Sequence, residues 1–82
     1  MSEPTPLIPI IDARGLACPQ PVLLARAGLA QQKPGGRIQL LATDPMSRVD
    51  LAAFCARRGH TLVTVTGAAT GWCFEIERGP RG

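Results

Sequence analysis

Short apolar runs alternate with helical stripes along the chain. Runs rich in β-branched residues predict strands, and apolar residues that recur at three- and four-residue spacing predict helices. The predicted elements are strands at residues 7–12, 37–42, 60–66 and 72–77 and helices at residues 18–33 and 47–58. Two helices that cover one face of a four-stranded mixed sheet bury both apolar surfaces. We therefore predict an α+β fold, a two-layer β-α-β-α-β-β sandwich.

Two of the predicted strands carry further positional signals. Pro9 has no N–H to donate to a neighbouring strand, so it predicts an edge strand or a late strand start. In the last strand, successive side chains point to opposite faces of the sheet. One set is Trp72, Phe74 and Ile76, and the other set is Cys73, Glu75 and Glu77. We expect the first set to face the core and the second to lie on the open face.

The helix ends are marked by familiar residues. Pro19 and Pro21 suit the first turn of a helix, where the N–H groups have no intrahelical partner. Pro34-Gly35-Gly36 stops the first helix. Ser47-x-x-Asp50 predicts a capping box at the start of the second helix, and Gly59 predicts its end.

The length of 82 residues, with 45% apolar residues, fits one small domain. We expect that domain at residues 7–78, between flexible tails at 1–6 and 79–82. No apolar run approaches the roughly 18 residues of a membrane helix, and the N-terminus lacks the basic and apolar segments of a signal peptide. We therefore expect a cytoplasmic protein without a membrane partner.

The basic balance is a weak indication of partners. The net charge is +3, and the basic residues, mostly arginines, are scattered along the chain without a basic run. With three aromatic residues and no Tyr, a stacking platform for single-stranded nucleic acid is poorly supplied. We expect no direct nucleic-acid binding, whereas an acidic protein partner remains compatible with the charge.

The sequence lacks the residue patterns of several common functional sites. His60 is the single histidine, and Cys18, Cys55 and Cys73 show no C-x-x-C spacing, so we predict no metal site. Gly15 stands alone, without a phosphate-loop or dinucleotide pattern. A Ser-His-Asp triad also finds no support.

Cys18 is the strongest chemical candidate. It occupies the predicted N-cap of the first helix, where amides such as that of Gln20 and the helix dipole favour an anion. Arg14 adds positive charge on the preceding loop. We therefore expect the pKa of this thiol to fall below its free value of about 8.5.

The other two cysteines are weaker candidates for a reactive thiol. Cys55 lies among alanines in the second helix, which predicts a small apolar filler. Cys73 shares its strand face with Glu75 and Glu77, which disfavour a thiolate. Beside Cys18, three further side chains are candidates for partner docking: Leu23, Leu24 and Arg48.

The stretch Asp12-Ala13-Arg14-Gly15-Leu16-Ala17-Cys18-Pro19-Gln20-Pro21 resembles the D-x-R-G-x-x-C-P-x-P signature of the TusA/SirA-like sulfur-carrier family. The resemblance extends from about Leu7 to Arg78. Further matching positions are Pro34-Gly35, Asp44-Pro45, Ser47, Asp50, Phe54-Cys55 and Gly59-His60. Gln20 departs from the acidic or charged residue that family members often carry, which bears on partner choice.

The resemblance implies that Cys18 carries sulfane sulfur as a persulfide, without a metal or organic cofactor. The implied donor is a cysteine desulfurase or a rhodanese-like protein, and the sulfur passes to an acceptor protein. Such relays lead to 2-thiouridine in tRNA, to sulfur oxidation, or to molybdenum-cofactor and selenium pathways. The motif residues around the carrier cysteine are Arg14, Gly15, Pro19, Gln20 and Pro21.

Three hypotheses follow in order of preference. The first is a sulfur relay that uses Cys18. The second is a redox-active thiol protein in which Cys73 resolves an oxidised Cys18. The third is a non-catalytic regulatory or interaction module, for which neither thiol is required.

Overall fold

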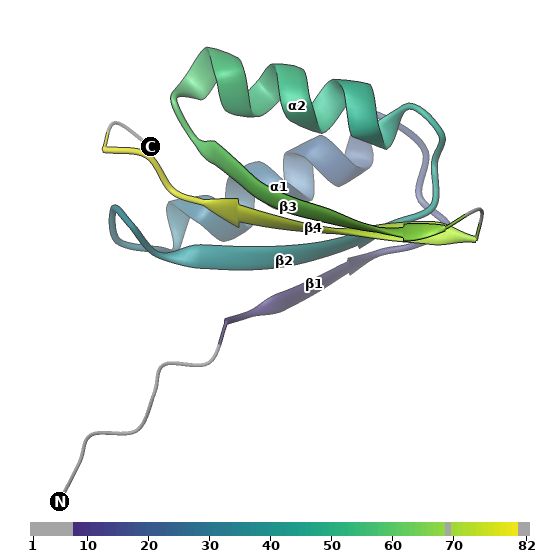
Figure 1. The fold of residues 1–82 in the computed structure, drawn as a ribbon, viewed down its shortest axis with the longest axis horizontal. Coiled ribbons are helices and arrows are strands. Elements are labelled where there is room, and N and C mark those ends of the chain that lie inside the picture. Colours follow the sequence, from purple (N-terminus) through teal and green to yellow (C-terminus); the bar gives the residue numbers. More distant parts are fainter. Residues whose placement is uncertain (1–7, 69, 81–82) are drawn as a thin grey trace, which may run out of the picture.

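The computed structural model describes residues 8–68 and 70–80 (Figure 1). Its elements are β1 (Ile10–Ala13), α1 (Gln20–Ala30), β2 (Arg37–Ala42), α2 (Ser47–Arg58), β3 (Thr61–Ala68) and β4 (Gly71–Glu77). This order confirms the predicted β-α-β-α-β-β sequence of elements. β1 begins at Ile10 rather than at Leu7, which lies outside the described residues. No helix in the described part of the chain has both the length and the apolar character needed to cross a bilayer.

The four strands form one mixed sheet in the order β1-β2-β4-β3. β1 runs parallel to β2, whereas β4 is antiparallel to both β2 and β3. Both helices cover the same face of this sheet (Figure 1), which confirms the predicted α+β two-layer sandwich. β1 is an edge strand, as Pro9 predicted, and the Pro9 carbonyl accepts the N–H of Gln39 at 2.9 Å.

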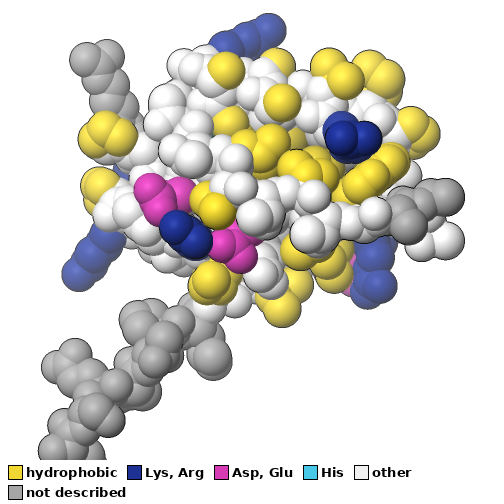
Figure 2. Space-filling view, in the orientation of Figure 1, with side chains coloured by type: hydrophobic (Ala, Val, Ile, Leu, Met, Phe, Trp, Pro, Cys, Tyr) yellow, Lys and Arg dark blue, Asp and Glu magenta, His cyan; other side chains and the backbone are white. Residues whose placement is uncertain are grey.

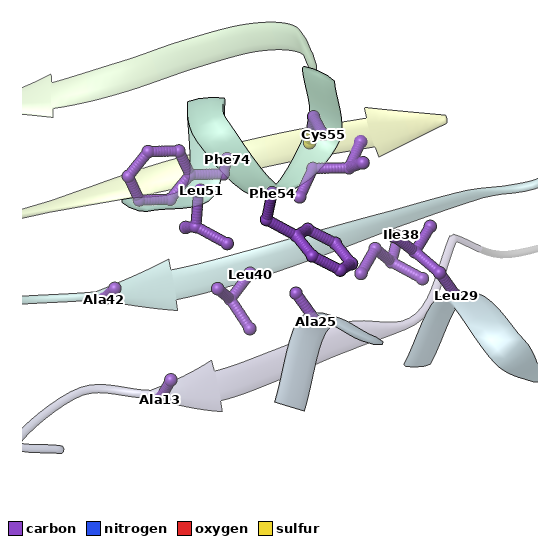
Figure 3. Close-up of a cluster of buried hydrophobic side chains, with 11 residues drawn as sticks. Ala13, Ala25, Leu29, Ile38, Leu40, Ala42, Leu51, Phe54, Cys55 and Phe74 are labelled. Carbon is purple, nitrogen blue, oxygen red and sulfur yellow. The ribbon is translucent and has the colours of Figure 1, made fainter. Parts of the chain in front are cut away.

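The hydrophobic core lies between the sheet and the two helices. Phe74 and Ile76 are fully buried there and Trp72 packs against the cluster, as the alternation along β4 predicted. Figure 3 shows the buried cluster, which consists of Ala13, Ala25, Leu29, Ile38, Leu40, Ala42, Leu51, Phe54, Cys55, Phe74 and Ile76. α1 approaches β1 closely at Gly28, since a Cβ at this position would lie 2.3 Å from Cδ1 of Ile11.

The open face of the sheet carries a polar network across β2 and β4. Arg37 donates to Glu75 at 2.9 Å and to Glu77 at 3.1 Å, and Gln39 donates to Glu75 at 3.0 Å. Acidic and basic side chains meet accordingly near the left end of the sheet in Figure 2. The hydrogen bonds from Gln39 and Arg37 lower the pKa of Glu75. Cys73 lies on this same face, as predicted.

The predicted capping box of α2 is wrong, whereas its predicted end is confirmed. The N-cap residue is Met46, and no side chain bonds to the open amides in the capping geometry. Ser47 is instead fully buried inside the first turn. The Asp44 carboxylate accepts the N–H of Met46 at 2.8 Å, so this Asx turn precedes the helix. Gly59 ends α2 in the left-handed conformation with φ 73°.

The chain end after β4 packs back against the turn between α2 and β3. Gly79 is buried and donates its N–H to Nδ1 of His60 at 3.0 Å, so contacts of the fold reach one residue beyond the boundary expected at Arg78. The expected N-terminal tail at 1–6 and residues 81–82 lie outside the described residues. The His60 ring also lies against Phe54, with 5.4 Å between ring centroids.

Candidate functional site

Cys18 lies on the loop between β1 and α1, beside the loop between β2 and α2. The two loops are neighbours because β1 and β2 run parallel and end side by side, with Ala13 opposite Ala42. Each loop leads into a helix on the same face of the sheet. The parallel pairing thus assembles the surroundings of the thiol from two distant segments of sequence.

Side chains of the second loop hold the backbone of the first. The N–H of Gly15 donates to Oγ1 of Thr43 at 2.9 Å, and the N–H of Cys18 donates to Oδ2 of Asp44 at 2.9 Å. Thr43 was not predicted as a site residue, and Asp44 was named only as a position that matches the family resemblance. The available signal was the Asp-Pro pair, which is typical of a turn whose aspartate binds nearby amides.

Asp44 is held as an anion by these contacts. Its hydrogen bonds with the amides of Met46 and Cys18 lower the pKa of its carboxyl group. An ionised carboxylate therefore stands directly beside the backbone of Cys18.

The Cys18 thiol is surrounded by acidic rather than basic groups. The Asp50 carboxylate on α2, together with partial burial and the charge of Asp44, raises the pKa of Cys18 to about 11. Ser47 acts in the opposite direction, because its hydroxyl stabilises the thiolate. The expected fall of this pKa is wrong, since these carboxylates disfavour the anion more than the helix end favours it.

The predicted N-cap position of Cys18 is also wrong. α1 begins at Gln20, its N-cap is Pro19, and no side chain caps it. The N–H of Gln20 donates to the carbonyl of Ala17 at 3.0 Å rather than to the sulfur. Cys18 therefore lies one residue before the N-cap of α1, and the amides of the first turn stabilise its thiolate little.

Arg14 does not supply the positive charge expected near the thiol. Its Nε and Nη2 both donate to Asp12, each at 2.9 Å. This exposed pair lowers the pKa of Asp12 to about 2 through the side-chain hydrogen bond with Arg14. Gly15 follows with φ 80°, a conformation that glycine adopts readily.

A groove of about 410 Å³ runs between α1 and α2 beside the thiol. Its walls combine apolar and basic side chains: Pro19, Val22, Leu23, Arg26, Asp50, Ala53, Phe54, Arg57 and Arg58. Leu23 is 53% exposed here, so it remains a candidate for docking. Pro19 and Asp50 place one end of the groove next to Cys18.

The other two docking candidates lie elsewhere. Leu24 is partly buried and packs against the core, so it is not available in the groove. Arg48 lines a second hollow between α2 and β3, with apolar neighbours that include Val49 and Val65. Figure 2 shows apolar side chains gathered over α2 and β3 around one basic side chain. Pro21, a predicted supporting residue, is fully buried, and Gln20 is exposed.

The three cysteines are free and lie in different environments. Cys55 is 3% exposed in the core, which confirms its prediction as an apolar filler, and burial raises its pKa to about 11. Cys73 is partly exposed on the open face, beside Arg14 and Leu41. Cys18 lies just before α1, which covers the opposite face of the sheet. This arrangement does not favour a disulfide between Cys18 and Cys73.

Comparisons with a family model, with related sequences and with solved structures all give TusA or SirA-like proteins. The family model for Sulfurtransferase TusA matches residues 10–78. The chain is 43% identical over 73 residues to the Sulfur carrier protein TusA of Pseudomonas paraeruginosa, covering 89% of this chain and 92% of that protein. It is 39% identical over 76 residues to the protein of the same name from Pseudomonas fluorescens, covering 93% and 92%. A crystal structure of a SirA-like protein from Desulfitobacterium hafniense superposes with a TM-score of 0.76 and 27% identity, covering 88% of this chain and 99% of the other.

Proposed function

Because this chain belongs to the TusA family of sulfur carrier proteins, we propose that Cys18 carries the sulfur as a persulfide and relays it from a donor enzyme to an acceptor protein. The position of the thiol supports this proposal. Cys18 is partly exposed, and Pro19, the next residue in the chain, lines the α1–α2 groove. Cys55 is buried and Cys73 lies on the other face. Cys18 is thus the cysteine that a partner bound in this groove reaches.

The transfer is an exchange between thiolates and persulfides. The Cys18 thiolate attacks the outer sulfur of the donor persulfide, a new S–S bond forms at Cys18, and the donor leaves as a thiolate. In the second step an acceptor thiolate attacks the outer sulfur on Cys18, and the Cys18 thiolate is released. No external oxidant or reductant is required, because the sulfane sulfur keeps its oxidation state throughout.

The donor is a cysteine desulfurase or a rhodanese-like protein, and the acceptor is a downstream sulfur-trafficking protein. Synthesis of 2-thiouridine in tRNA is one destination of such a relay. Free cysteines on the described surface suit a reducing compartment such as the cytoplasm. Gly15 and Pro19 shape the loop that presents the sulfur, and Asp44 fixes its backbone.

The α1–α2 groove supplies the docking surface in this proposal. Leu23 offers apolar contact area, and Arg26, Arg57 and Arg58 surround it with positive charge. Electrostatic complementarity raises the rate of encounter with a partner of opposite charge. The partner segment that enters the groove is therefore acidic and carries an apolar anchor.

The carrier assignment is tested by intact mass after incubation with a cysteine desulfurase and cysteine. The wild-type protein is expected to gain one sulfur atom, and Cys18→Ser is expected to gain none. Cys73→Ser and Cys55→Ala are the matched controls, and both are expected to gain one sulfur. Sulfur carried by the Cys18→Ser variant would overturn the assignment.

A further inference from the structure

The carrier loop, residues 14–20, takes its shape from hydrogen bonds within itself. One turn closes where the N–H of Leu16 donates to the carbonyl of Ala13 at 3.2 Å, and a second closes where the N–H of Gln20 donates to the carbonyl of Ala17 at 3.0 Å. Each bond joins residues three positions apart, as in a β-turn. These bonds therefore set the path of the loop but not its place on the rest of the fold.

Two hydrogen bonds to the β2–α2 loop fix the position of the carrier loop. The N–H of Gly15 donates to Oγ1 of Thr43 at 2.9 Å, across 28 residues of sequence. The N–H of Cys18 donates to Oδ2 of Asp44 at 2.9 Å, across 26 residues. The loop is thus held at two separate points, which prevents it from pivoting about either one.

The Thr43 side chain is itself held between two segments of the chain. Its hydroxyl accepts the Gly15 amide, and its methyl group lies close to Gly71 at the start of β4, where an added Cβ would lie 3.1 Å from Cγ2. Thr43 is half-buried and directly follows β2. Contacts on both branches of a β-branched side chain favour a single rotamer. Thr43 therefore presents its hydroxyl to the carrier loop in a fixed direction.

We propose that Thr43 is a positioning residue for sulfur transfer, because its hydroxyl anchors the carrier loop at Gly15 and so holds the Cys18 sulfur in one place beside the α1–α2 groove. The inference rests on the proposed function, since it concerns the same sulfur. Transfer between two proteins needs the attacking sulfur and the outer sulfur of the donor persulfide close together and aligned. A misplacement of about 1 Å can lower such a rate by about 100-fold. Thr43 supplies the placement without touching the reacting atoms.

A purely structural role for Thr43 fits its surroundings less well. The bond between Gly15 and Thr43 is exposed, so water can replace the hydroxyl as acceptor for the Gly15 amide, and little stability depends on it. Asp44, by contrast, also accepts the N–H of Met46 at 2.8 Å and so supports the start of α2. Replacement of Thr43 therefore frees the loop without disturbing the helix, which makes it the cleaner variant.

The anchor is tested by NMR relaxation of the backbone amides of the full chain, without any sulfur donor. Thr43→Val keeps the methyl group and removes the hydroxyl, so the order parameters of Gly15 and Cys18 are expected to fall from about 0.85 towards about 0.6. Thr43→Ser keeps the hydroxyl and is expected to retain the wild-type values. Thr61→Val makes the same change at an exposed position of β3, at the opposite end of the sheet, and is expected to have no effect. Unchanged order parameters in Thr43→Val would overturn the proposal.

The consequence for transfer is tested with a persulfide-loaded cysteine desulfurase at a series of donor concentrations. Thr43→Val is expected to lower the maximal rate of transfer to Cys18 by about tenfold or more, while KM for the desulfurase stays the same because the groove residues are intact. Thr43→Ser is expected to restore the rate. Cys55, which is 3% exposed, reports general loosening, and its protection from iodoacetamide is expected to persist in every variant. A Thr43→Val variant that exposes Cys55 or changes KM alone would overturn the positioning role.

Failure of this proposal and failure of the proposed function give different results. If the wild type acquires no sulfur, or if Cys18→Ser still acquires it, the carrier assignment fails and the positioning role falls with it. If the wild type acquires sulfur on Cys18 and Thr43→Val does so at the same maximal rate, the positioning role fails while the carrier assignment stands.

Discussion

At the scale of single residues, the Cys18 thiol and the His60 ring are both held in their neutral forms by different surroundings. The Asp50 carboxylate raises the pKa of Cys18, whereas burial, followed by Arg78 and Arg58, lowers the pKa of His60. Cys18 is partly exposed, but His60 is enclosed by the fold and accepts the Gly79 amide. The neutral group is thus accessible to a partner at Cys18 and built into the fold at His60.

His60 is expected to make folding stability depend on pH below about 6.5. The pKa of this group is lowered in the folded protein, so the unfolded chain binds the proton more readily near its ordinary pKa of about 6.5. The stabilisation is therefore present above that pH and is lost as the pH falls below it. Urea unfolding at pH 7.5 and pH 5.0 measures the difference. His60→Gln is expected to show a smaller difference, and an equal one would contradict the assignment.

The candidate carrier residue could be chosen from the sequence, but its chemical state could not be predicted. Cys18 stands out through the loop and prolines that surround it in the chain. Its pKa depends on Asp44 and Asp50, and the contact with Asp44 spans 26 residues. Both aspartates also fit the ordinary start of a helix, so local pattern did not separate the two roles.

At the scale of elements, the polar residues in the first turn of α2 do not cap the helix but affect the candidate site. Ser47 and Asp50 match a capping box in spacing, yet neither side chain caps the helix, and both affect the pKa of Cys18. The alternation of β4 and the end of α2 at Gly59 were predicted correctly, because each follows from residues adjacent in the chain. The capping box was predicted wrongly because the loop that carries Cys18 is distant in sequence and comes close to α2 only when the sheet forms.

The packing of Gly79 against the turn between α2 and β3 is expected to leave no room for an added methyl group. A Cβ at Gly79 would lie 1.9 Å from the carbonyl oxygen of Gly59, which is backbone and does not yield easily. Gly79→Ala is therefore expected to lower the free energy of unfolding by about 1–3 kcal/mol, a typical cost of overpacking. Denaturant unfolding provides the measurement. Pro80→Ala, at the next and exposed position, is the control, and equal stability of Gly79→Ala and wild type would refute the close contact.

At the scale of the whole molecule, the formal charge of +3 is less informative than where the arginines lie. Arg26, Arg57 and Arg58 line the groove beside the thiol, whereas Arg37 is paired with glutamates on the opposite face. The sequence shows only scattered arginines, because those of α1 and α2 meet only when the helices pack together. The groove beside the proposed carrier cysteine thus gathers three of the arginines of the chain.

Charge reversal in the groove is expected to slow association with the sulfur donor. Arg26→Glu and Arg57→Glu each replace attraction by repulsion, so the association rate at low salt is expected to fall by roughly tenfold. The difference is expected to shrink at high salt through screening. Lys33→Glu makes the same charge change at an exposed position outside the groove and serves as the control in surface-binding kinetics. An equal effect of all three would show that net charge, not the groove, directs binding.

The parallel pairing of β1 and β2 also determines how long the two loops at the site stay in contact. β1 has four residues and a single neighbouring strand, so its local opening requires less free energy than global unfolding. Cys18 follows β1, while Asp44 and Asp50 follow β2. Each fraying of this edge therefore separates the Cys18 amide from the Asp44 carboxylate, which it contacts at 2.9 Å. Amide hydrogen exchange in Ile10–Ala13 thus reports how often the loop that carries Cys18 detaches from the loop after β2.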